Sequence, residues 1–227
     1  MGLTMIIGIS GMIGSGKSTL AKGLHKHYKK SVLLEEFQEN DPVFNTFLKW
    51  MYEKQPNIHI GFQSYIIESL SDTFKKTVAK FKNNNLNFRD NHIFLDRFNI
   101  EHYVFAVVTL MDKDPKYQAG FDAMFEKIVD PEDNPDLAIF IDIDFNAFKA
   151  RLLARGRASE VDNYAQNETY FKLLHSLYKK LYIRLVEKFK IPYVIINSNN
   201  KSEKEVLQEA INIIDSYDFS KSKRYNE

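Results

Sequence analysis

A glycine-rich segment near the start of the chain carries residues that can bind a polyphosphate. The spacing G-x-x-x-x-G-K-S/T of a phosphate-binding loop is met by Gly11, Gly16, Lys17 and Ser18. In such a loop backbone N–H groups face phosphate oxygens, the lysine reaches the β- and γ-phosphates, and the serine hydroxyl binds Mg²⁺. The sequence therefore predicts ATP and Mg²⁺ as ligands. The residues expected to hold ATP here are Gly11, Met12, Ile13, Gly14, Ser15, Gly16, Lys17, Ser18 and Thr19.

Adjacent carboxylates follow a second apolar run. Glu35 and Glu36 end the run 32–36, and a carboxylate close to the γ-phosphate can accept the proton of a substrate hydroxyl. At least one of the two is expected to act in this way, and the other then simply ends the strand.

A further charged pair, Asp96 and Arg97, ends the apolar run 92–96. Asp96 is expected to bind Mg²⁺ together with Ser18. Arg97 is expected to neutralise the charge that develops on a transferring phosphoryl group, so it is predicted to be catalytic along with Lys17. Asp-Arg pairs are common after strands. This pair is a candidate because its strand is expected to end beside the phosphate-binding loop.

A cluster of arginines lies later in the chain. Arg151, Arg155 and Arg157 come close together at the end of a predicted helix, and the first two share one helix face. Arginines at such a place can close over bound phosphates as a lid, so all three are expected to bind ATP. A basic helix end exposed to solvent would leave the same pattern in the sequence.

The elements that position these residues are short apolar runs separated by longer amphipathic segments. Consecutive apolar residues are typical of strands in a sheet that is covered on both faces. Strand–helix alternation predicts an α/β fold whose parallel strands end at one shared edge. We expect a three-layer sandwich of the P-loop NTPase type, with five parallel strands flanked by helices and a short arginine-rich lid. The predicted strands are 5–9, 32–36, 92–96, 137–143 and 193–197, and the predicted helices are 17–29, 41–53, 57–83, 97–112, 116–128, 145–154, 167–190 and 202–216.

The composition favours a single domain over 1–217, with 218–227 as a flexible tail. The chain has 227 residues, of which 44% are hydrophobic, and a formal net charge of +1. The small net charge argues against nucleic acid as a partner, and the lack of cysteine excludes disulfides and thiol chemistry. No apolar run approaches the roughly 18 residues of a membrane span, so we expect a cytoplasmic protein with no membrane partner.

Other proteins with a phosphate-binding loop fit the sequence less well. A switch GTPase needs D-x-x-G after a strand, and no aspartate here has a glycine three residues later. The stretch 200–203 approaches the guanine-reading pattern N-K-x-D, but Glu203 replaces the aspartate and Ser202 is also a good helix N-cap. A small phosphotransferase is the class that remains.

The motifs in this order resemble the deoxynucleoside kinase family, which includes deoxycytidine, deoxyguanosine and bacterial deoxyadenosine kinases. The likeness covers roughly residues 5–200 and lies in GMIGSGKST, LLEE, MYEKQPNIHIGFQSY, LDRF, EHYVFA and RGRASE. It implies ATP-dependent phosphorylation of the 5′-hydroxyl of a deoxynucleoside, which serves nucleotide salvage. A purine deoxynucleoside is expected from the likeness to bacterial members, and a homodimer is expected from the family and from two amphipathic helices, 57–83 and 97–112.

The resemblance also assigns roles on the nucleoside side. Glu35 would be the general base, and Tyr52 and Glu160 would bind the sugar 3′-hydroxyl. Gln63, whose amide offers a donor and an acceptor, would read the base together with Glu101. The substrate-binding residues implied by the resemblance are Glu35, Tyr52, Phe62, Gln63, Arg97, Glu101, Phe105 and Glu160.

The chain departs from the family pattern around the base. Glu36 stands in place of a proline, Phe98 in place of a serine, and Leu70 in place of an arginine found in some members. Matching Glu101 to the family's base-contacting acid requires a one-residue deletion, and without that deletion His102 takes the place. These departures leave the preferred base open.

Two alternatives share the phosphate-binding loop. One is a nucleoside monophosphate kinase of the thymidylate kinase type, and the other is a non-catalytic nucleotide-binding regulator. Glu35 argues against the first, because an acceptor phosphate is already ionised and needs no general base. An assay of phosphoryl transfer distinguishes the second alternative from a kinase, because a regulator would bind ATP without transferring a phosphoryl group.

Overall fold

A five-stranded parallel sheet forms the centre of the computed structural model, which describes residues 5–36, 41–84, 86, 91–156 and 163–222. The strand order is β2-β3-β1-β4-β5, so the predicted α/β fold is confirmed. Each strand lies within two residues of its predicted ends. The strands are β1 (Met5–Gly11), β2 (Val32–Leu34), β3 (His92–Asp96), β4 (Leu137–Asp142) and β5 (Tyr193–Asn197).

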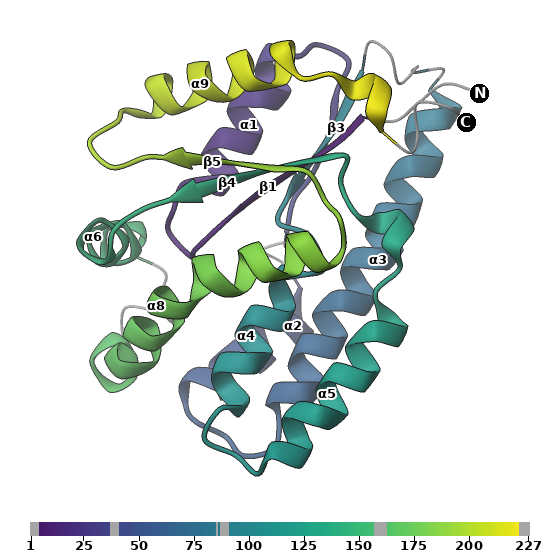
Figure 1. The fold of residues 1–227 in the computed structure, drawn as a ribbon. Helices are drawn as coiled ribbons and strands as arrows, with labels where there is room; N and C mark the ends of the chain where they lie inside the picture. Colours follow the sequence, from purple (N-terminus) through teal and green to yellow (C-terminus); the bar gives the residue numbers. More distant parts are fainter. Residues whose placement is uncertain (1–4, 37–40, 85, 87–90, 157–162, 223–227) are drawn as a thin grey trace.

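Helices cover both faces of the sheet (Figure 1). Helices α1 and α9 pack together over one face, while α8, α4 and α3 lie on the other. This arrangement explains the unbroken apolar runs, and all seven residues of β1 are buried. The helices are α1 (Lys17–His27), α2 (Pro42–Tyr52), α3 (His59–Asn83), α4 (Glu101–Leu110), α5 (Pro115–Ile128), α6 (Phe145–Arg155), α8 (Tyr164–Lys188) and α9 (Glu203–Ser216), with short 3₁₀ helices η1 (Pro131–Asp133) and η2 (Phe219–Lys221).

The register of the strands brings their carboxyl ends together. Ile9 of β1 lies opposite Asp96 of β3, and Gly11 lies opposite Ile141 of β4. A side chain at Gly11 would come within 2.6 Å of the Ile141 carbonyl oxygen, and the φ of Gly11 is +144°, so this position requires glycine. The phosphate-binding loop therefore leaves the sheet beside the end of β3, as the parallel topology requires.

Two element boundaries differ from the predicted ones in a way that affects the site. Strand β2 ends at Leu34, so Glu35 and Glu36 follow the strand. Helix α4 begins at Glu101 and is preceded by a turn in which Arg97 takes a left-handed conformation, with φ +73°. Both changes alter the direction in which charged side chains point at the edge of the sheet, namely Glu35 and Glu36 after β2 and Arg97 after β3.

The end of the described chain is packed against the sheet. Residues 218–222, which the sequence assigns to a flexible tail, include η2. The Ser222 hydroxyl donates to the Asp136 carboxylate, whose other oxygen accepts the backbone N–H of Ile6 at 2.7 Å. In the part of the chain that the structure describes, no helix is long and apolar enough to cross a membrane.

Candidate active site

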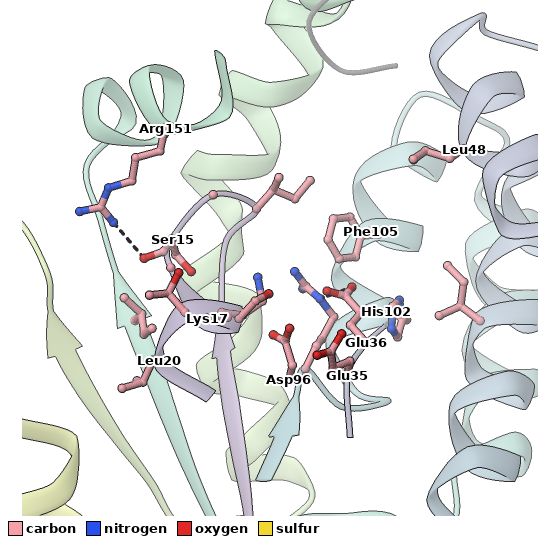
Figure 2. A pocket seen from close by; sticks show the side chains of 18 of the residues that line it. Ser15, Lys17, Leu20, Glu35, Glu36, Leu48, Asp96, His102, Phe105 and Arg151 are labelled. Atoms are coloured by element: carbon pink, nitrogen blue, oxygen red, sulfur yellow. Dashed lines mark hydrogen bonds and ion pairs between the residues drawn. The ribbon is translucent and has the colours of Figure 1, made fainter. Parts of the chain in front are cut away.

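A cavity of about 580 Å³ opens at the carboxyl ends of the strands. Figure 2 shows side chains from the phosphate-binding loop, the ends of β2 and β3, and α4 pointing into it. Most of the predicted site residues line it. Those are Ile13, Gly14, Ser15, Gly16, Lys17, Ser18, Thr19, Glu35, Tyr52, Phe62, Gln63, Asp96, Arg97, Phe105 and Arg151.

The phosphate-binding loop joins β1 to the first residue of α1. Gly14 and Gly16 have positive φ values, which turn the backbone so that the loop curls around the start of the helix. Lys17 is the first residue of α1, and its Nζ donates to the carbonyl oxygen of Met12 at 3.2 Å. The helix N-terminus and this lysine together favour an anion in the loop.

The Lys17 ammonium is buried without a carboxylate in direct contact among the described residues. Burial, reinforced by the positive charge of Arg97, lowers the pKa of Lys17 to about 8. A polyphosphate bound in the loop would favour the charged form again, because opposite charges stabilise ionisation. The loop is thus electrostatically prepared for a ligand with several negative charges.

Arg97 is the centre of a buried ionic network. Its side chain is 2% exposed, and its Nε lies 2.5 Å from Oε1 of Glu36. Its Nη1 lies 3.3 Å from Oε2 of Glu101 and donates to the Tyr178 hydroxyl. Burial disfavours the charged guanidinium, but Glu36, Tyr178 and Glu101 outweigh it and hold the pKa of Arg97 above its ordinary value. Arg97 therefore stays cationic at the edge of the cavity.

The two adjacent carboxylates after β2 have different surroundings. The Glu35 side chain is 48% exposed and pairs with Lys22 at 3.2 Å, on the outer part of the cavity wall. The Glu36 side chain is 15% exposed and pairs with Arg97. Burial raises the pKa of Glu36, although Arg97 and Lys17 act in the opposite direction. Of the two, Glu36 is the carboxylate that pairs with Arg97 and feels the charge of Lys17, which differs from the assignment of Glu35 by resemblance.

The predicted Mg²⁺ ligands, Ser18 and Asp96, both line the cavity. Asp96 is buried, and its Oδ1 has no hydrogen-bond partner among the described residues. A buried carboxylate oxygen without a partner fits a divalent cation, and Mg²⁺ commonly takes one or two protein oxygens and completes its shell with phosphates and water. These residues therefore suit the expected ion.

The far wall of the cavity is made by helices. Tyr52 ends α2, Phe62 and Gln63 lie near the start of α3, and Phe105 lies on α4. The Arg97 guanidinium lies over the Phe105 ring, with its carbon 5.0 Å from the ring centroid. An apolar slot with a few polar groups is typical of a site for a flat organic ligand.

Glu101 does not line the cavity, contrary to the prediction that it reads the base. It is fully buried, and its Oε2 accepts the Gly11 backbone N–H at 3.1 Å and the Tyr178 hydroxyl at 2.7 Å. The cavity wall instead contains His102. The alternative without the deletion, which gives His102 this place, is the one that the geometry supports.

A sequence profile described as deoxynucleoside kinase matches residues 7–217. The chain belongs to the deoxynucleoside kinase family. A deoxyguanosine kinase from Lactobacillus johnsonii is 29% identical over 188 residues, which is 79% of this chain and 77% of that enzyme. An uncharacterised protein from Mycoplasma pneumoniae is 28% identical over 207 residues, or 88% of this chain and 86% of that protein.

The fold is shared with a solved deoxyadenosine kinase from M. mycoides with bound dATP. The two chains superpose with a TM-score of 0.72 at 23% identity, over 93% of this chain and 100% of the other. This kinase fold and the family match confirm the predicted enzyme class, and they agree with the order of motifs along the chain.

The arginine lid predicted for this deoxynucleoside kinase falls only partly within the described residues. Arg151 lines the cavity, and its Nη1 donates to the Ser15 carbonyl oxygen at 2.9 Å. Arg155 ends α6, but its side chain is outside the described part, and Arg157 and Glu160 lie outside the described residues. The lid role of Arg151, Arg155 and Arg157 stays a prediction, and so does the contact of Glu160 with the sugar 3′-hydroxyl.

The departures from the family pattern outside the cavity are explained by packing. Phe98 is buried, and its ring would contact a side chain at Gly8 at 2.8 Å, so the ring occupies the space that this glycine leaves. Leu70 is buried in the hydrophobic core. Neither residue lines the cavity.

Sequence reasoning missed two tyrosines of α8. Tyr178 joins Arg97 to Glu101, and Tyr170 lines the cavity. Both lie in a long amphipathic helix whose apolar face is rich in aromatic residues, so the pattern that marks them is the same as for core residues.

Proposed function

We propose that this kinase transfers the γ-phosphoryl group of ATP to the 5′-hydroxyl of a purine deoxynucleoside. The products are the 5′-monophosphate and ADP, which makes the reaction a step of nucleotide salvage. The single observation that carries the proposal is the Glu36–Arg97 ion pair, which lines the same cavity as Lys17 and would there supply a proton acceptor and a fixed positive charge to the transferring phosphoryl group.

The phosphates of ATP would occupy the phosphate-binding loop. Lys17 and the loop N–H groups would bind the β- and γ-phosphates, and Arg151 would close over them from α6. Ser18 and Asp96 would hold Mg²⁺, which supplies charge neutralisation to the phosphates when bound. Residues on the opposite wall would then present the acceptor.

The deoxynucleoside would lie between α3 and α4. Phe62 and Phe105 would flank the base as apolar walls, and Gln63 would pair with its edge. Tyr52 would contact the sugar, and Glu160 is proposed to join it at the 3′-hydroxyl. This orientation points the 5′-hydroxyl toward the Glu36 carboxylate and the phosphate-binding loop.

The transfer step needs one proton acceptor. Glu36 would take the proton of the 5′-hydroxyl as that oxygen attacks the γ-phosphorus, and the bond to the β–γ bridging oxygen breaks so that its electrons leave with ADP. A raised carboxyl pKa makes Glu36 a better base, while Arg97 offsets the charge on the phosphoryl oxygens. Positioning of the two reactants would supply most of the acceleration.

The purine preference is supported by the names of two similar proteins, a deoxyguanosine kinase and a deoxyadenosine kinase. We also propose a homodimer, as the family resemblance implies, and a cytoplasmic location.

The test is a coupled assay of ADP release with ATP, Mg²⁺ and each of the four common deoxynucleosides at equal concentration. We expect turnover with at least one purine deoxynucleoside. Deoxynucleoside monophosphates form the second arm, because turnover with those alone would assign the thymidylate kinase type. A folded sample that binds ATP and turns over neither set would overturn the proposal in favour of a nucleotide-binding regulator.

A further inference from the structure

The Tyr178 hydroxyl joins a donor to an acceptor inside the buried network of Arg97. Tyr178 lies on α8 and is 1% exposed. Its hydroxyl donates to Oε2 of Glu101 at 2.7 Å and accepts a hydrogen bond from Nη1 of Arg97. A guanidinium can only donate and an ionised carboxylate can only accept, whereas a hydroxyl does both. The phenol therefore fits between the two charged groups.

Without this hydroxyl, Arg97 would turn toward Glu101. Nη1 of Arg97 lies 3.3 Å from Oε2 of Glu101, which is long for a hydrogen bond between charged groups. Both side chains are almost fully buried, so solvent screens their attraction little. Loss of the hydroxyl would let the guanidinium close this gap. Because Glu36 lines the cavity and Glu101 lies behind its wall, that movement takes the guanidinium away from the reacting groups.

The ring of Tyr178 is fixed by packing, so its hydroxyl is a rigid reference point. The ring meets Phe105 edge to face, with centroids 5.7 Å apart, and lies tilted against Phe140 at 6.2 Å. The Arg97 guanidinium carbon lies 5.9 Å from the centroid of the Tyr178 ring. Helix α8 packs against α4 (Figure 1). A side chain whose rotamer is locked by the core can hold a second side chain in a precise orientation.

We propose that Tyr178 is a positioning residue for Arg97, whose guanidinium its hydroxyl keeps turned toward the transferring phosphoryl group. The inference rests on the proposed function, in which Arg97 offsets the charge on the phosphoryl oxygens. Within the described part of the chain, the cavity lining includes Tyr170 of α8 but not Tyr178. Tyr178 would therefore act through Arg97 and touch neither substrate, so its effect should appear in kcat rather than in either KM.

The experiment is a double-mutant cycle of Tyr178→Phe and Arg97→Lys, assayed with ATP and the deoxynucleoside that the wild type phosphorylates best. In the wild-type background, Tyr178→Phe should lower kcat about tenfold or more and leave both KM values within about threefold. In the Arg97→Lys background the same change should cost no more than about twofold, because a lysine has no planar fork to orient. Tyr182→Phe removes another buried hydroxyl of α8 and should lower kcat no more than about twofold.

A pH profile separates positioning from a loss of packing. Besides burial, which raises the pKa of Glu36 most, the charged groups that act on it are Arg97 and Lys17, which lower it, and Asp96 and Glu101, which raise it. When the guanidinium turns away in Tyr178→Phe, it lowers this pKa less. The base must be ionised to act, so the acid limb of kcat against pH should move to higher pH. In Tyr182→Phe the limb should stay at its wild-type position.

Glu101→Gln covers the case in which Tyr178→Phe does not fold. Oε2 of Glu101 receives the Gly11 N–H, the Tyr178 hydroxyl and Arg97, and Oε1 has no hydrogen-bond partner among the described residues. An amide oxygen can therefore keep these contacts, and a fall in kcat of no more than about fivefold would support the hydroxyl as the positioning group. A larger fall in a folded sample would assign that role to the charge of Glu101 and refute the inference.

The failure of this inference is distinguishable from the failure of the proposed function. If the wild type phosphorylates a deoxynucleoside and folded Tyr178→Phe has the same kcat as Tyr182→Phe, only the inference fails. The same holds if Tyr178→Phe lowers kcat equally in both backgrounds of the cycle. If the wild type binds ATP and phosphorylates no deoxynucleoside, the proposed function fails and the inference fails with it.

Discussion

The two walls of the cavity are built on different principles. The phosphate wall comes from the loop after β1 and the ends of β2 and β3, and Arg97 pairs there with Glu36 and, behind the wall, with Glu101. The nucleoside wall comes from α2, α3 and α4. Among the described residues, Oε1 of Gln63 and both ring nitrogens of His102 on this wall have no hydrogen-bond partner. A group that already has partners is fixed in place before substrate arrives, and this suits catalysis. A group without partners gains most from a ligand that supplies them, and this suits selection.

The sharpest test of the phosphate wall compares its two adjacent carboxylates. Glu36→Gln removes the proposed proton acceptor, so kcat should fall by roughly 10²- to 10⁴-fold with ATP affinity retained. Glu35→Gln alters only a half-exposed pair with Lys22 and should change kcat by no more than a few-fold. Steady-state kinetics and ATP titration of both variants measure this. The reverse order of effects would restore Glu35 as the base.

The nucleoside wall should respond in KM rather than in kcat. Gln63→Leu removes the amide but keeps the size of the side chain, so the KM for the deoxynucleoside should rise roughly 10- to 100-fold. The KM for ATP should hardly change, because Gln63 lies on the opposite wall. A comparable loss in both KM values would mean that the two walls are not independent.

Glu101 tests whether a buried acid supports the loop or reads the base. Glu101→Gln weakens the acceptor for the Gly11 N–H, the Tyr178 hydroxyl and Arg97, so the free energy of unfolding should fall by roughly 1–3 kcal/mol. The preference among deoxynucleosides should stay the same. Chemical denaturation and the substrate panel measure the two effects, and a changed preference at unchanged stability would favour base contact.

The smallest expected effect is a proton linked to ATP binding. The pKa of Lys17 is lowered to about 8 in the empty loop, and phosphates should raise it again. The lysine is charged in both states near pH 7, but above about pH 8 the free loop loses the proton first. ATP affinity should therefore decline as pH rises above about 8, by at most tenfold per pH unit.

Calorimetry in two buffers with different ionisation enthalpies would show the proton uptake at pH 8.5. The same measurement on Lys22→Ala, which alters an exposed lysine of the same cavity, should still show it. Constant ATP affinity from pH 7 to pH 9.5 would contradict the assignment to Lys17.

The same contrast explains which parts of the site could be predicted from the sequence. The phosphate-binding loop is contiguous, its glycines are required by backbone geometry, and the strand before it is a plain apolar run. The ends of β1 and β3 are neighbours in any sheet of this order, so the position of Asp96 and Arg97 beside the loop follows from the strand pattern alone.

The remaining assignments depended on the conformation of single residues. Whether Glu35 or Glu36 turns inward depends on where β2 stops, and it stops at Leu34, two residues before the predicted end. Whether Glu101 or His102 faces the cavity depends on the turn at Arg97 and the late start of α4. Hydrophobic pattern does not determine such turns, because a shift of one residue changes the face without changing the composition of the segment.

The Asp136 carboxylate has a practical consequence for protein engineering. It accepts hydrogen bonds from Ile6 near the start of the described chain and from Ser222 near its end, and Figure 1 shows the start of β1 and η2 on the side of the sheet away from α6. A short linker could thus connect the ends into a circular permutant with new termini in a surface loop.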